Sequence, residues 1–143
     1  MKKVSARPVS RPSPAVGTVL VVDDEPAVRA LVTRVLRRDG FVVLEADGPR
    51  AAIELAGAHA GDIDLVVTDV SMPEMNGVNM VERLLVDRPG LRVMYTSGYD
   101  RDGLADVAQP PHEARLLRKP FSVGDLVAAV REVVAGPRLA QAG

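Results

Sequence analysis

Five polar side chains follow apolar runs at separate places along the 143-residue chain, and their types suit phosphate chemistry. They are Asp23 and Asp24 after the first apolar run, Asp69 at the end of the third, Ser97 at the end of the fourth and Lys119 after the fifth. Buried strands deliver such residues to the carboxyl edge of an open α/β sheet, where ligands bind. We therefore expect these side chains to lie close together.

The three aspartates predict a cation site. Carboxylates held a few ångströms apart repel each other, so they take up a proton or hold a cation between them. Their oxygens suit Mg²⁺ or Mn²⁺, which typically use one or two carboxylates together with water and phosphate oxygens. Beside such an ion, Asp69 could attack phosphorus in line and form an aspartyl phosphate. Lys119 would supply positive charge, and Ser97 a hydroxyl, to the phosphoryl oxygens.

Each of these residues also has an ordinary structural explanation. Asp24, which precedes Glu25-Pro26, could cap a helix. Asp69 could form an Asx turn, Ser97 could be a turn serine, and Lys119 could be a solvated surface lysine. Four such coincidences at one edge of a sheet are much less probable than one site, so we favour the site.

The apolar pattern predicts alternating strands and helices. Apolar runs begin near residues 18, 41, 64, 91 and 113, a spacing typical of successive βα units. Helical periodicity follows each run, and we expect helices over residues 26–38, 49–59, 77–87, 100–108 and 123–134. The pattern favours a doubly wound sheet of five parallel strands with five helices. The polar fifth run, interrupted by Arg115 and Arg118, suits an edge strand.

Composition indicates one globular domain. Hydrophobic residues make up 47% and charged residues 26% of the chain, and no run approaches the roughly 18 apolar residues of a membrane span. The chain has no cysteine and no apolar segment of a secretory signal near its start, so we expect a cytoplasmic protein. Beyond residue 16 it carries 14 basic and 19 acidic side chains, which argues against nucleic-acid binding.

The chain divides into three parts. Residues 1–16 are rich in Pro, Ser and basic side chains, and we expect a disordered basic arm there. Residues 17–135 contain the whole βα pattern and form the predicted domain. Residues 136–143 form a frayed tail. Since the chain stops soon after the last predicted helix, we expect no separate output domain.

Four segments resemble the receiver domain of bacterial response regulators. They are residues 21–25 (VVDDE), 68–77 (TDVSMPEMNG), 95–99 (YTSGY) and 119–121 (KPF), in the order and spacing of that family. The resemblance covers about residues 17–135. It implies a flavodoxin-like sheet with strand order 2-1-3-4-5. It also implies that a sensor histidine kinase or a histidine phosphotransfer protein phosphorylates Asp69.

The resemblance also implies a role for each site residue. Asp24 would bind Mg²⁺ directly, Asp23 would act largely through water, and Ser71 would offer its backbone carbonyl to the metal. Ser97 and Lys119 would contact the phosphoryl group, with Lys119 beside a cis bond to Pro120. Many receivers have an aromatic residue three positions before this lysine, and here that position is Leu116. We therefore expect the signal to pass through the last two strands in a different way.

These observations predict a stand-alone phosphoacceptor switch with at most weak self-phosphorylation and autodephosphorylation, not an enzyme. We expect a monomer or weak dimer whose output is contact with another protein, with no nucleic-acid or membrane partner. Two alternatives stay open. One is a degenerate receiver that binds partners without being phosphorylated. The other is a phosphohydrolase that forms an aspartyl phosphate, although such enzymes usually carry Asp-x-Asp after the first strand together with cap segments.

Overall fold

The computed structural model describes residues 16–98 and 114–136, which form five strands and four helices. The elements are β1 (Thr18–Val22), α1 (Pro26–Arg38), β2 (Val42–Ala46), α2 (Pro49–Ala58), β3 (Leu65–Asp69), α3 (Gly77–Asp87), β4 (Arg92–Ser97), β5 (Arg115–Arg118) and α4 (Val123–Ala135). The helix predicted over residues 100–108 and nearly all of the predicted arm and tail lie outside the described residues.

The strands form one parallel sheet in the order β2-β1-β3-β4-β5. This confirms the predicted flavodoxin-like order and places the polar β5 at an edge. The register brings the strand ends level with one another, since Val22 pairs with Thr68 and Asp69 pairs with Thr96. The carboxyl ends of β1, β3 and β4 therefore meet at one edge of the sheet.

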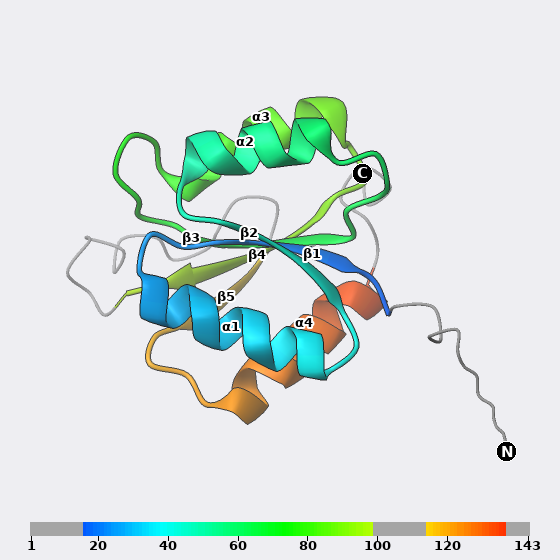
Figure 1. Cartoon of the computed structure of the whole chain (residues 1–143). Helices are drawn as coiled ribbons and strands as arrows, with labels where there is room; N and C mark the ends of the chain where they lie inside the picture. Colours follow the sequence, from blue (N-terminus) through cyan, green and yellow to red (C-terminus); the bar gives the residue numbers. More distant parts are fainter. Residues whose placement is uncertain (1–15, 99–113, 137–143) are drawn as a thin grey trace, which may run out of the picture.

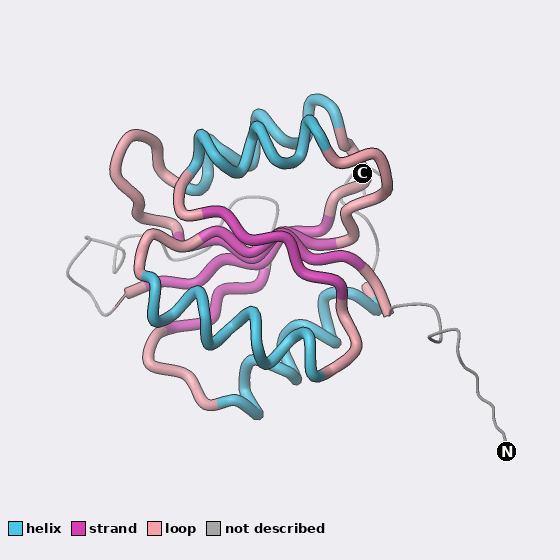
Figure 2. Tube along the Cα trace, in the orientation of Figure 1, coloured by secondary structure: helices cyan, strands magenta, loops and turns pink. Residues whose placement is uncertain are grey.

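Helices cover both faces of the sheet, with α2 and α3 on one side and α1 and α4 on the other (Figure 1). The tube view shows the same three layers (Figure 2). Alternate side chains of each strand enter opposite layers: Leu20 and Val22 pack toward α2 and α3, whereas Val19 and Val21 pack toward α1 and α4. Full burial of such a side chain contributes roughly 1.5–3 kcal/mol, and these two cores hold the sheet rigid beneath its carboxyl edge.

A proline or a capping side chain marks the start of α1, α3 and α4. Pro26 occupies the first turn of α1, where its missing N–H costs no hydrogen bond. The Asn76 side chain accepts a hydrogen bond from the Asn79 N–H (2.8 Å) at the start of α3, and the Ser122 side chain accepts one from the Asp125 N–H (2.9 Å) at the start of α4.

Among the described residues, none of the helices combines the length and the apolar character that crossing a bilayer requires.

Candidate carboxylate–lysine site

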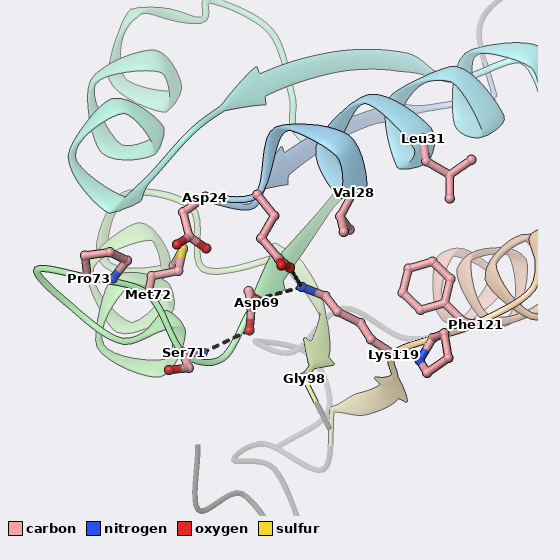
Figure 3. A pocket seen from close by; sticks show the side chains of 12 residues that line it. Asp24, Val28, Leu31, Asp69, Ser71, Met72, Pro73, Gly98, Lys119 and Phe121 are labelled. Atoms are coloured by element: carbon pink, nitrogen blue, oxygen red, sulfur yellow. Dashed lines mark hydrogen bonds and ion pairs between the residues drawn. The ribbon is translucent and has the colours of Figure 1, made fainter. Parts of the chain in front are cut away.

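Three strands deliver charged side chains to the carboxyl edge of the sheet. Asp23 and Asp24 follow β1, Asp69 is the last residue of β3, and Lys119 follows β5. The structure brings these four residues together, as the sequence predicts. Figure 3 shows three of them, Asp24, Asp69 and Lys119. Residues more than 90 positions apart in the chain thus share one site because parallel strands end at the same edge.

Lys119 lies at the centre of the site. Its Nζ is 2.9 Å from Asp69 Oδ2, 3.1 Å from Asp23 Oδ2 and 2.8 Å from Glu25 Oε1. The ammonium donates hydrogen bonds to Glu25 and Asp69 and forms an ion pair with Asp23, so three carboxylates surround its three N–H groups. Burial alone would lower the pKa of Lys119, but hydrogen bonds to Glu25 and Asp69 and the charges of Asp69 and Asp23 raise it above its ordinary value. The side chain therefore stays positively charged.

Asp69 is buried, and both of its carboxylate oxygens have a partner. Oδ2 accepts from Lys119, and Oδ1 accepts from the backbone N–H of Ser71 at 3.1 Å. The second contact is the local hydrogen bond of an Asx turn, so the turn explanation holds for Asp69 and does not conflict with a role in the site. The two contacts fix the orientation of the carboxylate and direct it toward Lys119.

Two hydrogen bonds hold the segment after β1, one of them from α1. Asp23 Oδ1 accepts from the Glu25 N–H at 2.9 Å, and Arg29 Nη1 donates to the Asp23 carbonyl at 2.8 Å. Burial raises the pKa of Asp23, with a further increase from Asp69, against the opposing effects of the Glu25 N–H and Lys119. The alternative explanation of Asp24 as a helix cap is wrong, because Glu25 occupies the N-cap position of α1. Asp24 is exposed.

The donor set fits a divalent cation. Carboxylate oxygens of Asp23, Asp24 and Asp69 all lie within 4.8 Å of one another. Three carboxylates concentrate negative charge that Lys119 alone does not balance, and hard oxygen donors are the ligands that Mg²⁺ and Mn²⁺ prefer. Like charges held together also favour uptake of a proton or a cation.

A pocket of about 740 Å³ opens beside these groups. One wall carries the polar residues Asp24, Glu25, Asp69 and Lys119, and apolar side chains complete the lining, among them Val28, Leu31, Met72, Pro120 and Phe121. Figure 3 shows Phe121, Leu31 and Val28 on the α1 side of Lys119, and Met72 and Pro73 on the opposite side of Asp69. A charged group of a larger molecule could thus reach Asp69 while its carrier contacts apolar surface.

The other predicted residues lie at or near this edge. Ser97 is buried, and its hydroxyl donates to the Gly98 carbonyl at 3.0 Å, while its own carbonyl accepts from the Lys119 N–H at 2.8 Å. The Lys119-Pro120 bond is cis, as expected. Leu116 pairs in register with Tyr95 and packs against the core on the α2 and α3 side.

Sequence reasoning missed Glu25 as a partner of Lys119. It also missed Arg29 as a donor to the turn after β1. The only indication in the sequence that Glu25 belongs to the site is its position, because it directly follows Asp23 and Asp24 in an acidic triplet after β1. Arg29 follows the N-cap residue Glu25 by four residues, so both lie on the same side of the start of α1.

The fold and the site together define a flavodoxin-like α/β protein with a carboxylate–lysine centre at the carboxyl edge of its sheet. The profile of the response regulator receiver domain matches residues 19–131, and the chain belongs to this family of two-component signalling proteins. The chain is 37% identical over 117 residues to the sensor kinase CckA of Brucella abortus, a match that covers 82% of this chain and 12% of that kinase.

Two further comparisons agree with the family. The response regulator receiver protein CpdR of Brucella abortus is 28% identical over 116 residues, which cover 81% of this chain and 95% of that protein. The crystal structure of the receiver domain from the hybrid histidine kinase CckA superposes with a TM-score of 0.70 at 32% identity, over 82% of this chain and 99% of that domain. The chain thus matches proteins in which the receiver is nearly the whole molecule and proteins in which it is a small part.

Proposed function

We propose that this receiver accepts a phosphoryl group on Asp69 from the phosphohistidine of a sensor histidine kinase or a histidine phosphotransfer protein. One observation carries the proposal: the buried Asp69 carboxylate lies 2.9 Å from Lys119 Nζ and within the acidic cluster with Asp23 and Asp24. A carboxylate nucleophile, a fixed positive charge and a set of hard oxygen ligands are the parts that phosphoryl transfer to an aspartate needs.

In the transfer step, a carboxylate oxygen of Asp69 forms a bond to phosphorus. The bond between phosphorus and the histidine nitrogen of the donor breaks, and its electron pair stays on that nitrogen. Lys119 keeps its proton and donates to a phosphoryl oxygen, which offsets the charge that develops there. The Ser97 hydroxyl turns from the Gly98 carbonyl to a second phosphoryl oxygen.

Mg²⁺ or Mn²⁺ would neutralise negative charge on the phosphoryl group. Asp24, Asp69 and the backbone carbonyl of Ser71 would hold the ion directly, and Asp23 would act through water. The exposed position of Asp24 and the place of Ser71 in the pocket lining support this assignment. The apolar side chains around the pocket would exclude bulk water when a protein donor docks.

The phosphorylated state would then be read by a partner protein that contacts the domain. Leu116 stands where many receivers carry an aromatic residue, so we propose that the change passes through β4 and β5 without an aromatic rotation. We further propose that the protein works in the cytoplasm as a monomer or weak dimer, without nucleic acid. Self-phosphorylation with small donors and autodephosphorylation would both be weak.

Intact-mass analysis with acetyl phosphate and Mg²⁺ tests the proposal. The wild-type chain should gain one phosphoryl group, and the gain should disappear in Asp69→Asn and in EDTA. Asp47→Asn is a matched control, because Asp47 is an exposed aspartate that follows β2 at the same edge of the sheet. It should be phosphorylated like the wild type. No added mass in the wild type would favour a degenerate receiver, and sustained phosphoester turnover would favour a phosphohydrolase.

A further inference from the structure

Glu25 occupies the N-cap position of α1, yet its side chain does not cap the helix. Within the described part of the chain it forms no capping hydrogen bond with the first turn. Its carboxylate instead crosses the pocket to Lys119, 94 positions away in the sequence, where Oε1 accepts from Nζ at 2.8 Å. Glutamate is a poor capping residue in any case. The contact with Lys119 is therefore the feature of this side chain that calls for a functional explanation.

The three carboxylates around Lys119 differ in exposure. The Asp23 and Asp69 side chains are 5% and 8% exposed, whereas the Glu25 side chain is 56% exposed. Separating a buried ion pair leaves an unpaired charge in the protein, but an exposed carboxylate is readily hydrated. Glu25 is accordingly the partner that Lys119 can release at the lowest cost.

The proposed phosphoryl transfer brings a further acceptor to Lys119. The ammonium donates hydrogen bonds to Glu25 and Asp69 and forms an ion pair with Asp23, so donation to a phosphoryl oxygen competes with these contacts. Glu25 also lines the pocket through which a donor must reach Asp69. Its negative charge repels an anionic donor at the position where that donor enters.

We propose that Glu25 determines donor specificity by competing for Lys119 and thereby slowing phosphorylation by small anionic donors. The inference rests on the proposed phosphorylation of Asp69. With acetyl phosphate, an Asp69 oxygen bonds to phosphorus, the bond between phosphorus and the acetyl oxygen breaks, and acetate leaves with the electron pair. A protein donor has binding energy from remote contacts with which to displace Glu25, and acetyl phosphate has almost none.

The test measures phosphorylation rates by intact mass at saturating Mg²⁺ for wild type, Glu25→Gln and Glu25→Ala. Both variants should react with acetyl phosphate about two- to fivefold faster than wild type, the range expected for one partly exposed charge. Glu25→Gln keeps the shape of the side chain, and Glu25→Ala removes its reach. Asp47→Asn, which removes another exposed carboxylate from the same sheet edge, should react at the wild-type rate.

A charge effect has two signatures that a purely structural effect lacks. The gain in Glu25→Gln should be smaller with phosphoramidate, which carries less negative charge than acetyl phosphate. It should also shrink as ionic strength rises, since salt screens charges at an exposed pocket. Equal or slower phosphorylation of both variants at low salt would overturn the inference and leave the proposed function intact. A wild-type chain that gains no phosphoryl group on Asp69 would overturn both.

Discussion

The backbone of Gly77 packs directly against the carbonyl group of Asp69. A Cβ atom at position 77 would lie 2.3 Å from that carbonyl oxygen and 3.2 Å from Thr68 Oγ1. The Gly77 N–H also donates to the Val70 carbonyl at 2.7 Å. The first turn of α3 is thus attached to the end of the strand that carries the proposed phosphoacceptor, at a separation that only glycine allows.

Gly77→Ala should therefore destabilise the protein and displace the end of β3. Overpacking of this kind typically costs about 1–3 kcal/mol, and urea unfolding measures it. Phosphorylation of Asp69 should slow in the same variant. Gly57→Ala is the control, because a Cβ at this position of α2 meets nothing within 4 Å. It should stabilise the protein by up to about 1 kcal/mol. Equal stability of the two variants would contradict the close approach.

The buried Asp23 should lower the stability of the folded protein when no metal is bound. Burial raises the pKa of Asp23, so the fold favours the neutral carboxyl over the charged one. Asp23→Asn should stabilise the metal-free protein at neutral pH by about 1 kcal/mol, a usual gain when an unfavourable functional group is removed. Denaturant unfolding in EDTA checks this. A loss of stability in Asp23→Asn would show that the ion pair with Lys119 outweighs desolvation.

Added Mg²⁺ should stabilise the wild type more than it stabilises Asp23→Asn. An ion that binds only the folded state stabilises it by mass action. The wild type should therefore gain more stability from added Mg²⁺ than Asp23→Asn does, and Asp47→Asn should gain as much as the wild type. The concentration dependence of the unfolding midpoint measures the difference. Identical gains in all three proteins would place the cation elsewhere.

Tyr95 should make stability depend on alkaline pH. Burial, with a smaller effect of Glu82, raises the pKa of Tyr95 from 10.0 to about 12. The unfolded chain releases this proton first, so the contribution is complete below pH 10 and is lost as the pH rises toward about 12. Tyr95→Phe should remove this part of the pH dependence. Absorbance titration of the phenolate measures the pKa directly, and a value near 10 would refute the prediction.

The same substitution tests an unusual feature of the core. The Tyr95 hydroxyl is buried and has no hydrogen-bond partner among the described residues. Replacing a group of this kind by an apolar one is close to neutral or stabilising, whereas loss of a satisfied hydroxyl costs roughly 0.5–1.5 kcal/mol. Tyr95→Phe should accordingly be at least as stable as wild type near pH 7. A clear loss of stability there would reveal a partner for the hydroxyl.

Arg88 should be a structural residue whose removal destabilises the α2–β3 connection. Its guanidinium donates to three carbonyl groups, those of Ala56 (2.9 Å), His59 (2.9 Å) and Gly61 (3.0 Å). Arg88→Met keeps most of the apolar stem but removes these donors, and we expect a loss of about 1–3 kcal/mol. Arg50→Met, on the exposed side of α2, should change stability by less than about 0.5 kcal/mol. Thermal unfolding compares the two.

Periodicity was sufficient to predict most of the elements. The apolar residues at positions 28, 31, 32, 35 and 36 recur at helical spacing, and Pro26 begins the helix that this stripe predicts. The five strands begin within about two residues of the predicted positions. The signal is clearest for β1, β3 and β4, because strands covered on both faces are nearly continuous in apolar residues. The predicted parallel strands were also enough to expect that Asp23, Asp24, Asp69 and Lys119 lie close together, because the carboxyl ends of parallel strands share one edge of the sheet.

Tertiary structure alone decided how these side chains pair. The sequence does not reveal that Asp23, Glu25 and Asp69 are the carboxylates that reach Lys119, because these contacts depend on side-chain directions in the folded chain. The same holds for the Ser97 hydroxyl, which donates to Gly98 in this structure, and for the contact between Gly77 and Asp69. A periodic pattern reports which face of an element is buried. It carries no information about distances between side chains from distant parts of the chain, and those distances determine the chemistry of this site.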